Sequence, residues 1–126
     1  MIDNVIYEGK KLILEFLGIG PKKIGNDYTW NDSVFFRISS KDYEYVIREI
    51  IDYSKFDTSI EWAFKFLDKL AELKYKFEIG TTLSSELKHD YYCEIWSIST
   101  GYGDTFPEAI FKAAVKFIKW YNKEQK

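Results

Sequence analysis

The first part of the chain carries apolar residues at intervals of three, four and seven, which is the spacing of one face of an amphipathic helix. The residues on this face are Val5, Ile6, Leu12, Ile13, Phe16 and Leu17. The pattern predicts a helix over residues 4–17, ended by Gly18 and the Gly20-Pro21 pair, because proline cannot continue a helix. We expect this helix to cover part of a sheet or to mediate self-association.

A second helical pattern, TSIEWAFKFLDKLAEL, begins at Thr58. Thr58 and Glu61 have the spacing of a capping box, in which each side chain accepts a hydrogen bond from the backbone N–H of the other residue. The apolar residues at helical spacing predict a buried stripe made of Ile60, Ala63, Phe64, Leu67 and Leu70. We therefore expect a helix over residues 58–73.

The last helical pattern begins at Thr105, and Thr105 with Glu108 again has the spacing of a capping box. Pro107 lies in the first turn, where its missing N–H costs little. The predicted apolar face consists of Ala109, Ile110, Ala113, Ala114, Phe117, Ile118 and Tyr121. Because the alanines are small, we expect this helix, over residues 105–122, to approach a sheet closely.

Three short segments have the composition and alternation of β-strands. They are residues 33–39, 75–82 and 91–99, and the last is apolar on both sides, as is typical of a central strand. The turn-rich segment before residue 33 predicts a connection, and residues 41–53 fit either a helix or an extended arm, of which we favour the helix. The pattern predicts an α+β fold in the order α-β-α-β-β-α, with one small antiparallel sheet of three to four strands packed with helices.

Composition narrows the class of protein. A chain of 126 residues with 46% apolar residues is long enough for one domain with its own core, so we expect a single domain over residues 1–126. The formal net charge of −2 gives no overall field that favours nucleic acid or an anionic membrane. One cysteine excludes an intramolecular disulfide, and neither a signal peptide nor a membrane span is visible. We expect a soluble cytoplasmic protein.

A glycine-rich segment, Gly101-Tyr102-Gly103, stands between a predicted strand and a predicted helix, which is the order found in phosphate-binding loops. A dinucleotide site needs a third glycine and a P-loop needs Gly-Lys-Ser/Thr, and neither is present. The capping box of Thr105 also occupies N–H groups that a phosphate would need. We interpret the segment as a tight turn from strand to helix.

Candidates for catalysis are few. His89, beside Asp90 and near Glu86, has the residue types of a general base with an orienting carboxylate, but a lone histidine in a polar connection is more often only solvated. Cys93 lies in an apolar strand pattern, which favours a buried structural thiol over a nucleophile. A single histidine also leaves a zinc site short of ligands. We expect no enzyme, metal or cofactor.

Two features indicate binding. Aromatic residues make up 19% of the chain, which is more than a small core needs, and aromatic side chains are enriched at interfaces. The candidate partner contacts are Tyr28, Trp30, Tyr43, Tyr45 and Tyr102. The last helix also aligns Lys112, Lys116, Lys119 and Lys123, which could contact nucleic acid. We favour a solvated face for these lysines, because only two arginines are present and the net charge is negative.

Two parts of the chain together have a recognisable pattern of residues. The first part begins with YSKFDTSIEWAFKFLDKL, and the residues that carry the pattern there are Tyr53, Ser54, Asp57, Trp62, Lys69 and Leu70. The second part begins at DTFPEAIFKA, and the residues that carry it there are Thr105, Pro107, Glu108, Ala109, Ile110 and Ala113. At these positions the chain resembles the phage ABA sandwich domain family of small phage and prophage proteins. The resemblance covers residues 53–118 and implies a sandwich of helices and strands, a viral or prophage origin and no known catalytic residues.

From this resemblance we expect a non-enzymatic accessory protein, such as a counter-defence or host-takeover inhibitor that binds a host protein in the host cytoplasm. The alternatives are a nucleic-acid-binding protein that uses the four lysines, and a binder that sequesters a small signalling molecule. A homo-oligomer is compatible with each of them.

Overall fold

The computed structural model describes residues 2–32, 36–82 and 90–124 and contains helices and antiparallel strands. In chain order the elements are α1 (Ile2–Leu17), β1 (Lys22–Ile24), β2 (Asp27–Asn31), β3 (Arg37–Ser40), α2 (Tyr43–Tyr53), α3 (Ile60–Glu72), β4 (Phe77–Thr81), β5 (Tyr91–Ile95), β6 (Ser99–Gly103) and α4 (Phe106–Glu124). The predicted α+β class is confirmed. The helix favoured for residues 41–53 is also confirmed, as α2.

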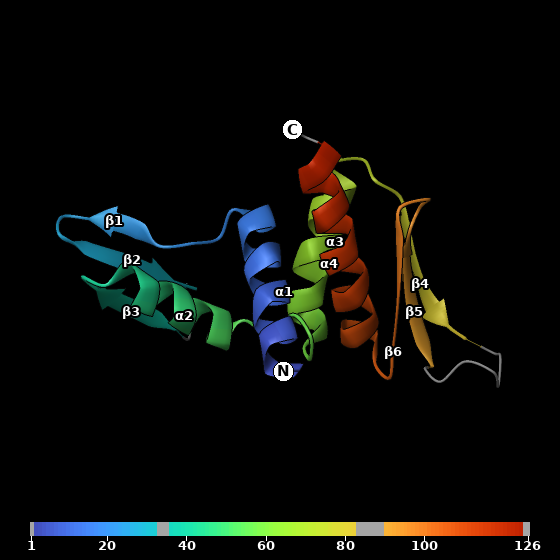
Figure 1. The fold of residues 1–126 in the computed structure, drawn as a ribbon, viewed down its shortest axis with the longest axis horizontal. Helices are drawn as coiled ribbons and strands as arrows, with labels where there is room; N and C mark the ends of the chain where they lie inside the picture. The colour runs from blue at the N-terminus through green and yellow to red at the C-terminus, as the bar shows by residue number, and fades with distance from the viewer. Residues whose placement is uncertain (1, 33–35, 83–89, 125–126) are drawn as a thin grey trace.

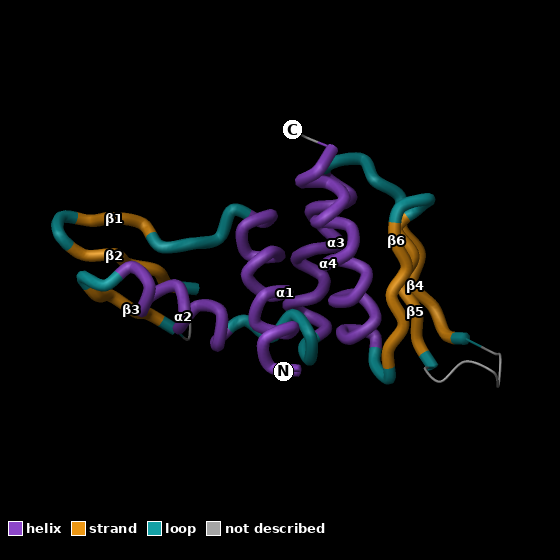
Figure 2. The backbone as a smooth tube through the Cα atoms, viewed as in Figure 1, coloured by secondary structure: helices purple, strands orange, loops and turns teal. Residues whose placement is uncertain are grey.

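Helices occupy the centre of the molecule and strands lie at both ends (Figure 2). The strands form two separate sheets, with the orders β1-β2-β3 and β4-β5-β6, so the prediction of one shared sheet is wrong. α2 packs on β2 and β3, whereas α4 packs on β5 and β6. α1 contacts α2 on one side and α3 and α4 on the other, and it therefore joins the two halves (Figure 1).

The hairpin β1–β2 replaces the predicted connection before residue 33. Ile24 pairs with Asp27, so the hairpin loop is the two-residue segment Gly25-Asn26. Gly25 has a φ of +63°, the backbone that a type II′ turn requires at its first central position. α2 then begins at its N-cap, Asp42, whose Oδ1 accepts hydrogen bonds from the N–H groups of Glu44 and Tyr45.

β5 is the central strand of its sheet, as predicted, but the predicted strand 91–99 ends at Ile95, and a second strand, β6, begins at Ser99. Ser97 has a φ of +60°, which turns the chain between β5 and β6, and Ile98 N–H donates to the Ile95 carbonyl. β6 then pairs back on β5, with Cys93 opposite Gly101. The glycines of the segment 101–103 therefore lie inside a strand, and the interpretation of that segment as a tight turn is wrong.

The glycines are required because α4 lies directly against β6. A Cβ atom on Gly101 would be 2.3 Å from the carbonyl oxygen of Ala109, and one on Gly103 would be 2.7 Å from the Ala109 nitrogen. Ser99, buried beneath the helix, donates from Oγ to the Ala113 carbonyl at 2.9 Å. The predicted close approach of the alanine face to a sheet is confirmed, and the sheet contributes to it with its own small residues.

Capping differs between the last two helices. In α4, Thr105 Oγ1 accepts from Glu108 N–H at 3.2 Å, as predicted, while Glu108 Oε2 accepts from the N–H of Asp104 and not of Thr105. In α3, the N-cap is Ser59 and not Thr58, because Ser59 Oγ accepts from Trp62 N–H at 3.5 Å. The capping box predicted at Thr58 is therefore wrong.

The face of α3 that enters the core is shifted from the predicted one. Its buried residues are Ala63, Phe66, Leu67 and Leu70. Ile60 and Phe64, predicted to be buried, are 38% and 44% exposed. The shift follows from aromatic packing, because the Phe66 ring contacts Phe16 of α1 and Phe117 of α4.

Candidate binding groove

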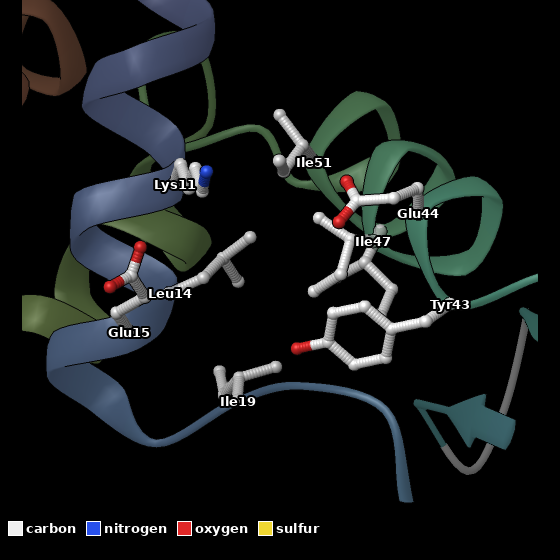
Figure 3. Close-up of a pocket in the computed structure, with 9 residues that line it drawn as sticks. Lys11, Leu14, Glu15, Ile19, Tyr43, Glu44, Ile47 and Ile51 are labelled. Carbon is white, nitrogen blue, oxygen red and sulfur yellow. The ribbon is translucent and has the colours of Figure 1, made fainter. Parts of the chain in front are cut away.

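A groove lies between α1 and α2, at the junction of the two halves (Figure 3). Its volume is about 340 Å³. The residues that line it are Lys11, Leu14, Glu15, Ile19, Tyr43, Glu44, Ile47, Ile50 and Ile51. The groove thus combines an aliphatic interior with charged and hydroxyl groups.

Helical periodicity brings one tyrosine and three isoleucines of α2 to this groove. Tyr43, Ile47, Ile50 and Ile51 are spaced by four, three and one, so they share one face of the helix. Ile50 and Ile51 are buried, and Ile47 is half-buried and faces Leu14 across the groove (Figure 3). The floor is therefore apolar and in part accessible.

The end of α1 closes one side of the groove through a Schellman motif. Gly18 has a φ of +74°, its N–H donates to the Glu15 carbonyl, and Ile19 N–H donates to the Leu14 carbonyl. This motif often brings the residue after the glycine against a residue of the last helical turn. Here both Ile19 and Leu14 line the groove, so a local helix-ending signal sets its shape.

Charged groups stand at the mouth. Lys11 and Glu15 project from α1, and Glu44 projects from α2 (Figure 3). Within the described part of the chain, none of these three groups forms an ion pair. Two carboxylates and one ammonium give the mouth a formal charge of −1, which favours a ligand that carries positive charge beside an apolar group.

Tyr43 is the member of the groove that the sequence had already indicated as a partner contact. Its ring is 44% exposed, and its hydroxyl points across the groove toward α1 and Ile19 (Figure 3). Tyr28 of β2 packs edge to face against Tyr43 with ring centroids 5.1 Å apart, and Lys23 lies over the Tyr28 ring. Two of the predicted aromatic contacts are thus neighbours, and one orients the other.

The remaining predicted aromatic contacts lie elsewhere. Trp30 belongs to an aromatic cluster with Phe36 and Tyr53, and Tyr53 donates a hydrogen bond to Asp32. Tyr45 is on α2 outside the groove, and its hydrogen bond with Glu49 raises the pKa of the phenol. Tyr102 is exposed on β6 at the other end of the molecule. The structure does not gather the five aromatics into one surface.

The first two of the four lysines of α4 lie beside β6. Lys112 forms an ion pair with Glu108 at 3.0 Å, and the Lys116 ammonium donates to the backbone carbonyl of Thr100 at 2.9 Å. Lys119 and Lys123 are exposed. Lysines at an edge strand discourage pairing with another chain, so Lys112 and Lys116 have a structural role.

Of the candidate catalytic groups, Cys93 and Asp90 lie in the described part of the chain. The Cys93 thiol is fully buried, and this burial raises its pKa to about 12, which leaves no thiolate near neutral pH. His89 and Glu86 lie outside the described residues, and Asp90 is exposed. Among residues 2–32, 36–82 and 90–124, no cluster of His, Cys, Asp and Glu could hold a metal ion. In the same part of the chain, no helix has the length and apolarity to cross a membrane.

Comparison with known protein families, characterised proteins and solved structures finds no match for this chain. The resemblance to the phage ABA sandwich domain family therefore stays a prediction from the residues that carry it. The groove between α1 and α2 combines an apolar floor with charged groups at its mouth, and we argue a function from it.

Apart from Tyr43, sequence reasoning missed the groove residues. The relevant signals were present as helical stripes, since Leu14 follows Ile13 on α1 and Ile47 and Ile50 share a face of α2. These stripes predict burial but not the partner against which each helix packs. The sequence predicts that the first helix covers a sheet or mediates self-association. In the structure α1 packs against α2 on one side, and the strands β1, β2 and β3 lie between these two helices in the chain.

Proposed function

We propose that this protein is a non-enzymatic binding module that takes a segment of a partner protein into the groove between α1 and α2. In line with the family resemblance, the partner is a host protein and the module is a phage or prophage accessory protein that inhibits it. The observation that carries the proposal is the groove itself, a partly accessible apolar floor with charges at its mouth that form no ion pair among the described residues.

The composition of the groove defines the segment that it would accept. An aliphatic or aromatic side chain fits against Leu14, Ile47 and Ile19, where it would be removed from water. A lysine or arginine next to that side chain fits the net negative mouth formed by Glu15 and Glu44. Exposed tyrosine is a frequent anchor at protein interfaces, which is the role given to Tyr43.

A photoreactive residue tests this proposal directly. Tyr43 and Tyr45 lie on the same helix and are 44% and 47% exposed, but only Tyr43 lines the groove. Each is replaced in turn by benzoylphenylalanine, and the protein is irradiated in a nuclease-treated bacterial lysate at high salt. We expect a discrete cross-linked protein from position 43 and not from position 45, identified by mass spectrometry.

A floor variant shows whether the cross-link depends on the groove. Ile47→Glu places a carboxylate on the apolar floor while leaving the buried Ile50 and Ile51 in place. We expect this variant to lose the position-43 cross-link and to keep its circular dichroism spectrum. Equal cross-linking from both tyrosine positions, or a cross-link that survives Ile47→Glu in the folded protein, would contradict the proposal.

A second candidate function is the capture of a small molecule in the same groove. The volume of about 340 Å³ supports it, because ligand sites usually measure about 300–1,000 Å³. Purified native protein and Ile47→Glu are denatured after incubation with a bacterial metabolite extract, and the released compounds are compared by mass spectrometry. A compound that is released unchanged from the native protein and not from Ile47→Glu would favour this candidate over the first, provided that position 43 gives no cross-linked protein.

A further inference from the structure

The second sheet has one edge that is built differently from the others. Two hydrogen-bonded pairs flank the ladder between β4 and β5. Trp96 N–H donates to the Lys76 carbonyl just before β4, and Thr82 N–H donates to the Asp90 carbonyl just after it. Hydrogen-bonded pairs alternate along an antiparallel ladder. Phe77, Ile79 and Thr81 therefore turn their backbone N–H and C=O groups away from β5, toward the outer edge.

Each of the other three edge strands contains a cationic residue or accepts a hydrogen bond from one. β1 contains Lys22 and Lys23, β3 contains Arg37, and Lys116 donates to the backbone of β6 at Thr100. Natural sheets use such charges to prevent pairing with another chain. β4, with the sequence FEIGT, contains no cation, and its one charged residue is Glu78. Lys76, just before β4, lies over the Trp96 ring on the side of β5. Within the described part of the chain, the outer edge of β4 therefore has no cation such as those at the other three edges.

The side chains of β4 are also incompletely covered. α4 packs mainly on β6 and β5, and it reaches β4 much less. Phe77 and Ile79, on the face toward α4, are only half-buried, and Thr81 on the same face is exposed. Among the described residues, β4 thus combines an unpaired edge with apolar side chains that a further strand would cover.

We propose that a second copy of this chain binds at this edge, with the two β4 strands antiparallel about a twofold axis at Ile79. This register pairs all five residues of the strand. Ile79 then faces Ile79 of the other copy, Phe77 faces Thr81, and Glu78 faces Gly80. The two Glu78 carboxylates are then not opposite each other. A twofold axis at Glu78, reached by sliding one strand by two residues, would place Glu78 opposite its own copy, which destabilises a sheet.

The result is a continuous six-stranded sheet with α4 of each copy on the same face. A twofold interface repeats the same contacts on both copies, which is the commonest form of homodimer. The dimer leaves the groove between α1 and α2 free, because α3 and α4 lie between that groove and β4 (Figure 1). The inference is therefore independent of the proposed function.

Size-exclusion chromatography with light scattering over a series of protein concentrations measures the dimer. Thr81→Pro removes an outward N–H from an exposed residue and no bond to β5. The matched control is Tyr102→Pro, which also follows a glycine and also removes an outward N–H, but at the edge formed by β6. We expect Thr81→Pro to raise the dissociation constant at least about tenfold and Tyr102→Pro to leave it unchanged.

Charged pairs at the twofold axis test the register. Ile79→Lys and Ile79→Glu each place like charges opposite each other, and we expect each variant alone to be monomeric. An equimolar mixture places lysine opposite glutamate, and we expect a heterodimer to form. A native chain that stays monomeric at the highest concentration, a dimer unaffected by Thr81→Pro, or a mixture that stays monomeric would each overturn the proposal.

Discussion

The backbone of Gly101 lies against the backbone of Ala113, so that a Cβ atom on Gly101 would be 2.4 Å from the Ala113 nitrogen. This contact seats α4 on β6, and neither partner can move without displacing a helix or a strand. We expect Gly101→Ala to lower the free energy of unfolding by about 3 kcal/mol or more, because overpacking against side chains alone already costs about 1–3 kcal/mol. Urea denaturation of the native chain and the variant measures the difference.

Gly20 provides the control for this substitution. It has no atom within 4 Å of a built Cβ, and its φ is not positive. We expect Gly20→Ala to change the free energy of unfolding by no more than about 1 kcal/mol, and in the stabilising direction, because alanine restricts the unfolded chain. Similar losses for the two variants would show that the contact between α4 and β6 is looser than described.

The start of α3 gives a prediction that separates two adjacent residues. Ser59 Oγ accepts from Trp62 N–H, whereas the Thr58 side chain has no such role among the described hydrogen bonds. We expect Ser59→Ala to lower the free energy of unfolding by about 1 kcal/mol, the usual cost of losing an N-cap, and Thr58→Ala to cost much less. Chemical denaturation of the two variants measures this, and the reverse ranking would restore Thr58 as the cap.

The elements that the sequence predicted well are those whose patterns are long and locally complete. α4 has a face of Ala109, Ile110, Ala113 and Phe117 that repeats over several turns, and its cap at Thr105 lies beside it in sequence. Every signal for this helix is within a few residues of the backbone it determines. The structure accordingly confirms its face and its cap.

The sequence predictions are wrong where a short pattern is compatible with two local structures. Trp96 and Ile98 continue the apolar run of β5, so the sequence gives no sign that Ser97 adopts a left-handed backbone and reverses the chain. The strands β1 and β2 are short and mostly exposed or half-buried, so they lack the alternation by which a strand is recognised. The sequence pattern therefore predicts only a turn-rich connection over residues 22–32.

The candidate groove depends on tertiary contacts, which single-sequence patterns do not specify. Leu14 and Ile47 belong to separate helices, and each helical stripe predicts only that some other element covers it. Tyr43 could be proposed from the surplus of aromatic residues, but its partner Tyr28 could not be assigned to it. Tyr28 contacts Tyr43 because α2 packs on β2, and this tertiary contact has no local sequence signal.

The buried Cys93 thiol predicts a dependence of stability on alkaline pH. Burial raises its pKa from 9.0 to about 12, so the folded protein holds the thiol proton more tightly than the unfolded chain does. This contribution to stability is fully present below pH 9 and is lost as the pH rises from 9 to 12. We expect the melting temperature of the native chain to fall more steeply over that range than that of Cys93→Ala.

The same thiol should resist alkylation. Only the thiolate reacts with iodoacetamide, and the folded protein at pH 8 holds almost none. We expect mass spectrometry to find no adduct on the folded protein after a treatment that fully alkylates the urea-unfolded chain. An adduct on the folded protein at a comparable rate would mean that the strand β5 opens far more often than its complete burial implies.

The lysine row of α4 tests the nucleic-acid alternative. Lys112 and Lys116 are already engaged by Glu108 and by the Thr100 carbonyl, and the chain has a net charge of −2. Of the four lysines in the row, only Lys119 and Lys123 have no ion pair or hydrogen bond among the described residues. Two such lysines are too few for tight binding, because affinity for a duplex grows with the number of phosphates neutralised. We expect fluorescence anisotropy to detect no binding of a double-stranded RNA at physiological salt.

Charge reversal tests whether any residual binding of RNA is specific to the lysine row. Lys119→Glu with Lys123→Glu removes the two free cations, and Lys22→Glu with Lys23→Glu removes the same charge from β1 at the other end of the molecule. At low salt, any weak association should fall equally for both double variants, since it reflects overall charge alone. An affinity that falls steeply with salt and is lost only with Lys119 and Lys123 would show instead that the exposed half of the lysine row is a specific phosphate-binding surface.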